Sequence, residues 1–294
     1  MTQLSASRWL RRVSLPAVIL VVLAGSATLH ADDLKHLKLS SGVDMAYVDR
    51  GGGAPALVFI HCGNCQMGIW TETLDAFGLT HRVVAMDLAG HGKSSSTRVR
   101  WTLEGLGADV AELVKTLNLG KVVLIGNSLG GPTALEAAKI LGPGQVLGVV
   151  AVDTLQNVEM EWPEESFNQM LAAYQADFAK ACDAAMQQIV APTASQQVKE
   201  RIGRETCDND PKAFLALFPT LRTYDQAKAL AAAGVPVRAI NGSLFPTAVE
   251  INRKHAPGFS AVVLDGVGHY PQVERPAEFQ SALRKIVGEL AAKP

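Results

Sequence analysis

The sequence predicts an α/β fold in which a mostly parallel central sheet of about eight strands has helices on both faces. Short runs rich in Val, Ile, Leu and Ala alternate along the chain with longer segments of helical periodicity, which is the order of strands and crossover helices. The apolar runs are continuous rather than alternating, as is typical of strands buried on both faces. With 294 residues, 48% of them hydrophobic and 19% charged, the chain can also bury a large core, which excludes a disordered protein.

Seven apolar runs are the strand candidates, and three amphipathic segments are the helix candidates. The strands are expected at residues 43–48, 56–60, 83–86, 122–125, 146–152, 235–240 and 261–264, and the helices at residues 103–117, 132–141 and 276–290. Residues 157–230 carry helical patterning without a convincing strand, so we expect a helical cap insertion that covers one end of the sheet. The core of the fold would then consist of residues 32–156 and 231–294.

The first 31 residues have the order of a secretion signal. Three arginines precede an uncharged apolar run over residues 13–29, and the small residue Ala31 follows it. We therefore predict a signal peptide over residues 1–31 and an exported protein, either periplasmic or secreted. The alternative is an uncleaved N-terminal anchor, but the run is shorter than the roughly 20 apolar residues that a spanning helix needs. No stable membrane insertion is expected after the signal has been removed.

The charge balance bears on the partners of the protein. The 27 Lys and Arg residues against 28 Asp and Glu give a formal net charge of −1, and loss of the three signal arginines would take this charge to −4. A nucleic-acid binder needs a basic surplus for its phosphate contacts, so this class is excluded. A small-molecule substrate is compatible with the balance, and the sequence leaves the oligomeric state open.

A serine nucleophile is indicated by the motif Gly126-Asn127-Ser128-Leu129-Gly130. The motif directly follows a predicted strand and precedes a predicted helix, which is the strand-turn-helix context of a nucleophile elbow. The flanking glycines are needed because the serine sits on a sharp turn where side chains would clash. Because a serine hydroxyl is a weak nucleophile, it needs a base and a third group that orients the base.

His269 is the best candidate for this base among the seven histidines. It stands in Gly266-Val267-Gly268-His269-Tyr270, directly after the last predicted strand, and therefore at the same sheet edge as the elbow. His61 at a strand end and His91 in a turn are its competitors.

Four segments in a fixed order make the chain similar to the α/β-hydrolase fold family over residues 40–290. They are His61-Cys62-Gly63-Asn64, the Asp-x-x-Gly-x-Gly-x-Ser turn from Asp87 to Ser94, the elbow around Ser128, and Gly268-His269 with Glu274-Arg275-Pro276. The resemblance implies catalysis by Ser128 and His269, with the backbone N–H groups of Gly63 and Leu129 forming the oxyanion hole. It also implies a reaction without a cofactor.

The acid that orients the histidine departs from the commonest pattern of the family. The family often carries this acid in a Gly-x-x-Asp segment after the strand predicted at residues 235–240, but here Phe245 occupies the acid's position. Some members place the acid one strand earlier, where Asp153 follows a buried strand. A carboxylate there needs a polar partner, and a histidine N–H is a suitable one. Glu250 and Asp265 are weaker candidates.

Two other motifs suggest different chemistry. Cys62-x-x-Cys65 between a strand and a helix has the spacing of a dithiol oxidoreductase, although nothing else in the chain suggests that fold. In an oxidising compartment, Cys62 with Cys65 and Cys182 with Cys207 could instead form disulfides, although four cysteines allow three pairings. The Gly-Lys-Ser sequence at residues 92–94 lacks the earlier glycine of a phosphate-binding loop, because Asp87 stands there. No metal site is expected.

We expect a carboxylesterase-like serine hydrolase that acts through an acyl-enzyme on a small, partly apolar ester. The apolar preference comes from the Met and aromatic residues of the insertion, although these residues could equally pack the insertion onto the sheet. Other hydrolases of the same fold use the same groups, namely lactonases, peptidases, C–C hydrolases and perhydrolases. A degenerate, non-catalytic binding protein is the remaining alternative, because the usual acid is absent.

Overall fold

The computed structural model describes residues 33–98 and 100–292 and contains a sheet of eight strands in the order β1-β2-β4-β3-β5-β6-β7-β8. The pairs β1–β2 and β2–β4 are antiparallel, and all later neighbours are parallel. The predicted sheet is therefore confirmed, whereas the predicted signal peptide lies outside the described residues. The strands are β1 (Lys35–Lys38), β2 (Asp44–Arg50), β3 (Ala56–Ile60), β4 (Val83–Met86), β5 (Val122–Asn127), β6 (Val146–Val152), β7 (Val237–Gly242) and β8 (Ser260–Leu264).

Strand β1 is the one that the hydrophobic pattern does not predict. It lies at the edge of the sheet, and three of its four side chains are exposed, with only Leu37 half-buried. A short strand with two lysines has no apolar run to mark it, and charged edge strands of this kind discourage pairing with other chains.

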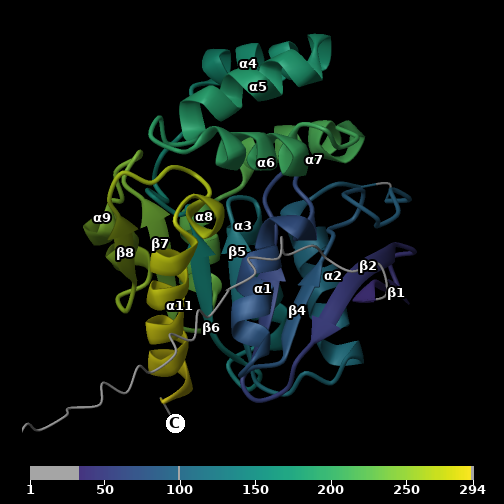
Figure 1. The fold of residues 1–294 in the computed structure, drawn as a ribbon, viewed down its shortest axis with the longest axis vertical. Helices are drawn as coiled ribbons and strands as arrows, with labels where there is room; N and C mark the ends of the chain where they lie inside the picture. The colour runs from purple at the N-terminus through teal and green to yellow at the C-terminus, as the bar shows by residue number, and fades with distance from the viewer. Residues whose placement is uncertain (1–32, 99, 293–294) are drawn as a thin grey trace, which may run out of the picture.

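Helices cover both faces of the sheet (Figure 1). Side chains of α2 (Leu103–Thr116), α3 (Gly130–Leu141) and α8 (Gln226–Ala232) share one buried cluster with Val58 and Ile60 of β3. On the opposite face, α1 (Thr71–Gly78) and α11 (Pro276–Ala291) share a second cluster with Leu57 and Phe59. Alternate residues of one strand thus point into two separate cores, which explains the continuous apolar runs in the sequence.

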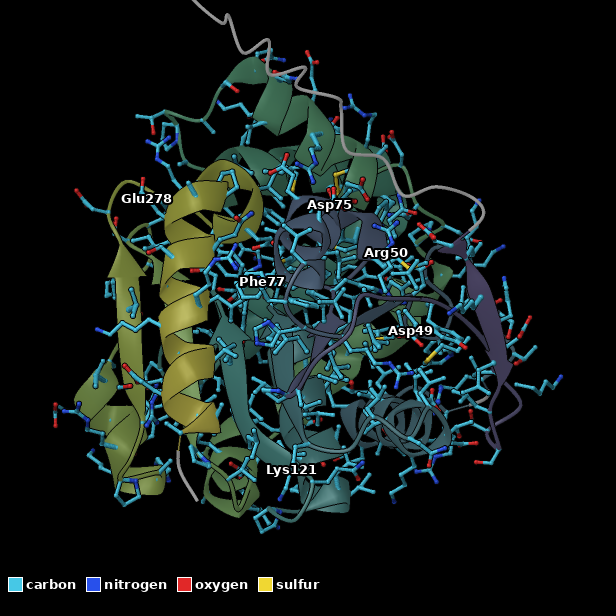
Figure 2. The ribbon with its side chains drawn as sticks, turned by 60° about the horizontal axis from the view of Figure 1, so that its bottom comes forward. Asp49, Arg50, Asp75, Phe77, Lys121 and Glu278 are labelled. Atoms are coloured by element: carbon cyan, nitrogen blue, oxygen red, sulfur yellow. A yellow bond between two sulfur atoms is a disulfide. The ribbon has the colours of Figure 1, made fainter. Side chains whose placement is uncertain are left out.

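Ion pairs fix the antiparallel side of the sheet. Asp49 near the end of β2 accepts hydrogen bonds from Nε and Nη2 of Arg82, at 2.9 and 2.8 Å, and the arginine holds the pKa of this carboxyl group below its usual value. The next residue, Arg50, pairs with Asp75 of α1 at 3.1 Å (Figure 2). The end of β2 is therefore tied both to the start of β4 and to a helix on one face.

The segment between β6 and α8 contains helices and no strand in its described residues. It forms α4 (Glu164–Ala176), α5 (Phe178–Ile189), α6 (Gln196–Thr206) and α7 (Lys212–Thr223). In Figure 1, α4 and α5 are the outermost layer, and α6 and α7 lie between them and the sheet. Three of the four helices from α5 to α8 have a side-chain cap, since Asp177, Ser195 and Asp225 accept hydrogen bonds from amides at the starts of α5, α6 and α8.

Five aromatic side chains hold this helical segment together. Phe167 stacks on Phe218 with 4.8 Å between ring centroids, and Phe214 lies 5.1 Å from Phe218 and 5.4 Å from Tyr174. Phe178 is 5.6 Å from Tyr174. We call these five residues the aromatic cluster, and the ring-to-ring contacts between them all lie within the segment.

The remaining short helices connect the strands to their neighbours. They are η2 (Met67–Trp70), α9 (Val249–His255) and α10 (Pro271–Glu274). Over residues 33–98 and 100–292, the structure has no helix whose length and apolar character would let it cross a membrane.

Candidate active site

Ser128 lies on a strained turn between β5 and α3. Its φ of 52° is in the left-handed region, which costs a residue with a side chain on the order of 1–3 kcal/mol. A Cβ at Gly126 would collide with the backbone of Gly130, and a Cβ at Gly130 would collide with the carbonyl oxygen of Ile60. Both glycines of the motif are therefore required by close backbone approach, and the serine is presented at the carboxyl end of β5.

Asp153 and His269 meet at the same edge of the sheet. Oδ2 of Asp153 lies 2.6 Å from Nδ1 of His269, and its Oδ1 accepts a hydrogen bond of 2.9 Å from the amide of Gly242. Asp153 directly follows β6, has a φ of 42° and is 2% exposed. Because Nδ1 faces a carboxylate, the hydrogen of a neutral His269 ring belongs on Nδ1, which leaves Nε2 as an acceptor.

The other acid candidates have partners elsewhere. Glu250 pairs with Arg253 at 2.6 Å, and Asp265 accepts a hydrogen bond of 3.3 Å from Ser243. Phe245, at the position where the commonest family pattern has the acid, is 40% exposed. Of the three acids, Asp153 is the one that contacts His269.

Asn127 connects the loop of His269 to the turn of Ser128. Its Nδ2 donates hydrogen bonds to the carbonyl oxygens of His269 at 3.1 Å and Val152 at 2.9 Å, and its Oδ1 accepts one of 3.1 Å from Gln272. Among the described residues, no hydrogen bond joins Ser128 to His269 directly. The fully buried Asn127 side chain therefore links the His269 loop to the Ser128 turn. In the sequence, this role is indicated only by the position of Asn127 between Gly126 and Ser128.

Glu274 holds the two residues that flank His269. One oxygen of its buried carboxylate accepts hydrogen bonds from the amides of Gly268 at 2.9 Å and Ala191 at 3.0 Å, and the other accepts one of 3.0 Å from Tyr270. The amide of His269 itself donates to the carbonyl of Ile189 at 2.8 Å. The histidine loop is thus fixed both to α10 and to the end of α5, which the sequence motif alone does not reveal.

Gly63 and Leu129 are neighbours across the site. A Cβ built on Gly63 would lie 3.9 Å from Cβ of Leu129 and 3.0 Å from the Phe214 ring. In the described part of the chain, neither the Gly63 nor the Leu129 amide donates a hydrogen bond within the protein. Gly63 and Leu129, each with an unpaired amide, are therefore neighbours at the Ser128 turn, and the Phe214 ring of α7 covers Gly63.

The competing histidines are buried and hold the backbone. In His61, Nδ1 donates to the carbonyl of Cys62 at 2.7 Å and Nε2 accepts from the amide of Leu88 at 2.9 Å. Burial lowers the pKa of His61 to about 3 and that of His91 to about 4, so both rings are neutral at pH 7.

Asp87 likewise fixes a turn. Its carboxylate accepts hydrogen bonds from the amides of Met67 at 2.7 Å and Lys93 at 2.8 Å. Burial raises the pKa of this group to about 6.

All four cysteines are in disulfides, which pair Cys62 with Cys65 and Cys182 with Cys207. The first pair is buried, with 2% and 0% exposure, so it offers no surface to a protein dithiol substrate. The described residues contain no group of three or more His, Cys, Asp and Glu side chains placed to bind a metal ion.

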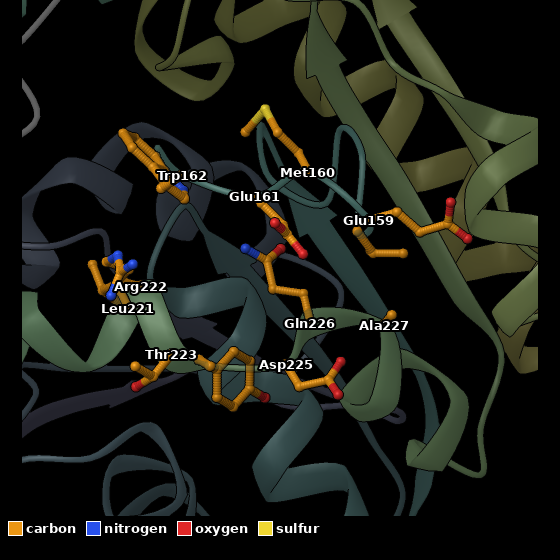
Figure 3. A pocket seen from close by; sticks show the side chains of 12 residues that line it. Glu159, Met160, Glu161, Trp162, Leu221, Arg222, Thr223, Asp225, Gln226 and Ala227 are labelled. Atoms are coloured by element: carbon orange, nitrogen blue, oxygen red, sulfur yellow. The ribbon is translucent and has the colours of Figure 1, made fainter. Parts of the chain in front are cut away.

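A separate cavity of about 510 Å³ lies between the two chain connections of the helical segment (Figure 3). Residues 158–162 line one side of it and residues 221–227 the other. Met160 and Trp162, two members of the expected apolar set, line this cavity, whereas Ser128 and His269 do not. Of the other members, Phe214 reaches the site through its contact with Gly63.

Comparison with known proteins finds hydrolases of the same fold. Over 241 residues the chain is 26% identical to 3-oxoadipate enol-lactonase 1 of Acinetobacter baylyi, covering 77% of this chain and 86% of that protein. It is 23% identical to the 2-hydroxy-6-oxo-6-(2'-aminophenyl)hexa-2,4-dienoic acid hydrolase of Metapseudomonas resinovorans, covering 86% and 90%. The fold superimposes on a thermophilic esterase from Thermogutta terrifontis with a TM-score of 0.75 at 21% identity, covering 87% and 98%.

The family itself follows from a match that spans most of the chain. Residues 57–282, which include the sheet from β3 to β8, the Ser128 turn, Asp153 and His269, match the model of the alpha/beta hydrolase family. The chain belongs to the alpha/beta hydrolase family.

Proposed function

We propose that this protein is a serine hydrolase that cleaves small, partly apolar carboxylic esters through an acyl-enzyme. The observation that carries the proposal is the 2.6 Å contact between Nδ1 of His269 and Asp153, on a loop that Asn127 ties to the Ser128 turn. A histidine oriented in this way near a half-buried serine is the arrangement that activates a hydroxyl for acyl transfer.

The reaction has two halves with the same geometry. Oγ of Ser128 attacks the ester carbonyl carbon while Nε2 of His269 takes the hydroxyl proton, and Asp153 stabilises the imidazolium that forms. The Gly63 and Leu129 amides donate to the oxyanion of the tetrahedral intermediate. When the intermediate collapses, the C–O bond to the alcohol breaks and the alcohol takes the proton from His269. Water then attacks the acyl-enzyme by the same route and releases the acid and Ser128.

The preference for a partly apolar substrate rests on Phe214. Its ring covers Gly63, so a substrate whose carbonyl oxygen reaches the Gly63 amide would lie against an aromatic surface. The rest of the aromatic cluster packs behind this ring and holds it in place.

Covalent labelling with a fluorophosphonate probe tests the serine. The wild-type protein should be labelled, Ser128→Ala should not, and Ser166→Ala, which changes an exposed serine of α4, should label like the wild type. No labelling of the wild type would favour the alternative of a non-catalytic binding protein.

A cyclic ester is the second candidate substrate, because a relative with 26% identity over most of this chain is an enol-lactonase. A lactone and an open ester need the same attack by serine and the same oxyanion donors. Steady-state rates on matched pairs, an ester of a hydroxy acid and the corresponding lactone, decide between them. A higher kcat/KM for open esters of varied acyl length supports the first candidate, and a higher value for lactones supports the second.

We also propose that the protein is exported to an oxidising compartment. The proposal is supported by the predicted signal peptide over residues 1–31 and by the pairing of all four cysteines. The intact mass and N-terminal sequence of the protein recovered from a periplasmic or culture fraction test it. Recovery only from the cytoplasm with residues 1–31 still attached would contradict export.

A further inference from the structure

The short loop that contains Gly63 is joined to the end of α6 by a reciprocal pair of amide hydrogen bonds. Nδ2 of Asn64 donates to the carbonyl of Thr206 at 2.6 Å, and Nδ2 of Asn209 donates to the carbonyl of Asn64 at 2.8 Å. Asn64 is 3% exposed, so both bonds lie in a site where water competes little. The helical segment therefore forms hydrogen bonds with both the side chain and the backbone carbonyl of Asn64, the residue next to Gly63.

The loop is also closed on itself. The amide of Cys65 donates to the carbonyl of Cys62 at 3.2 Å, and a disulfide joins the same two residues. Asn64 has a φ of 53°, and a positive φ is what the third residue of a type II turn requires. Within this closed turn, the peptide before Gly63 has little freedom except to move with the turn as a whole.

A second disulfide anchors the other partner. Cys207 directly follows Thr206 at the end of α6 and is bonded to Cys182 of α5. Asn209 also donates to the carbonyl of Glu205 at 2.8 Å, which fixes its side chain to the same helix end. The contact thus joins two disulfide-bridged units, one in the Gly63 loop and one in the helical segment.

We propose that Asn64 and Asn209 are positioning residues that hold the Gly63 amide where the oxyanion forms. This inference rests on the proposed function. Neither side chain touches the substrate, and both act through the Gly63 peptide. A small displacement of an oxyanion donor destabilises the transition state more than the bound substrate, because the charge on the oxygen develops only in the transition state.

The test uses substitutions whose new residues can adopt the wild-type backbone conformation. Asn64→Gly tolerates the left-handed φ and removes the bond to Thr206, and Asn209→Ala removes the bond to the Asn64 carbonyl. The matched control is Asn118→Gly, since Asn118 also has a left-handed φ, of 49°, but lies in the loop before β5, at the other end of the parallel strands. All proteins are purified with both disulfides intact, and their folding is checked by circular dichroism and thermal melting.

In each of the two variants we expect kcat for an ester to fall tenfold or more while KM changes less than twofold. The inhibition constant of a trifluoromethyl ketone, whose adduct with the serine places an oxyanion at the same point, should rise by a similar factor. Asn118→Gly should match the wild type in both measurements. If Asn64→Gly does not fold, Asn209→Ala gives the same readouts from outside the loop.

Two results overturn the inference in different ways. Folded variants with wild-type kcat and ketone affinity, or with a raised KM alone, show that the two asparagines do not position an oxyanion donor, while the proposed function stands. A wild-type protein that neither labels with a fluorophosphonate nor cleaves any ester overturns the proposed function and this inference with it.

Discussion

The replacement Glu274→Gln tests how strongly one buried carboxylate controls the catalytic geometry. The side chain keeps its size but loses its charge and one of its two acceptor oxygens. If the remaining oxygen still accepts the hydrogen bonds from the amides of Gly268 and Ala191, the amide of Tyr270 loses its acceptor and faces an NH₂ group. A hydrogen bond to a charged group contributes about 1.5–3 kcal/mol, and the two retained bonds weaken to about 1 kcal/mol each.

The total loss is therefore about 3 kcal/mol of unfolding free energy, after part of it is offset because a buried charge is removed. Since Gly268 and Tyr270 flank His269, the imidazole should also shift. A displacement of about 1 Å can lower a rate by about 10²-fold, so we expect kcat to fall between about 10-fold and 100-fold.

Urea denaturation and steady-state ester hydrolysis measure the two effects. The matched control is Glu278→Gln on α11, whose carboxylate is exposed and lies 3.8 Å from Arg275 (Figure 2). A surface pair of this kind contributes little, so Glu278→Gln should change neither stability nor kcat appreciably. If Glu274→Gln retains wild-type kcat although it is destabilised, Glu274 supports the fold and not the position of His269.

Three further perturbations have defined outcomes. Asp153→Asn should lower kcat by several powers of ten because it favours the wrong histidine tautomer, as known for triads of this kind, and near-wild-type kcat would assign the acid to another residue. His91→Gln should flatten the pH dependence of the unfolding free energy. The pKa of His91 is lowered to about 4 in the folded protein, whereas in the unfolded chain the residue protonates near pH 6.5. His91 therefore lowers the unfolding free energy by about 1.4 kcal/mol for each pH unit below 6.5. Asp87, whose raised pKa of about 6 makes the folded state take up a proton, opposes this loss between about pH 6 and 4 in both proteins; an unchanged slope between pH 7 and 5 in urea melts of the variant would contradict the assignment. Removal of the disulfide Cys182–Cys207 by two serine substitutions should destabilise the helical segment by about 3.5 kcal/mol for a separation of 25 residues, and limited proteolysis of residues 164–223 at the wild-type rate would argue against this.

The parts of the fold that the sequence predicts are those with strong local patterns. The doubly buried strands from β3 to β6 are mostly continuous apolar runs, and the Gly-x-Ser-x-Gly turn has a backbone requirement that only glycine meets. Helix α1 has no comparable signal, since its eight residues are too few to show a helical period.

The residues around the site likewise fall into those that the sequence predicts and those that it does not. Asp153 and His269 could be singled out because each directly follows a strand at a known edge of the sheet. The roles of Asn127, Glu274 and Asn64 could not be predicted, because their side chains bind backbone groups up to 142 positions away, which are brought together only by the packed structure.

The left-handed backbone of Ser128, Asp153 and Asn64 sets a trade-off between stability and activity. The three residues, with φ of 52°, 42° and 53°, follow the strands β5, β6 and β3, which are neighbours in the sheet. Glycine would relieve the strain at Ser128 by about 1 kcal/mol, whereas at Asn64 and Asp153 it would also remove the buried hydrogen bonds of the side chain. Selection for thermal stability alone would therefore favour glycine at position 128, and a heat-tolerant descendant that keeps the serine must be gaining its stability elsewhere in the chain.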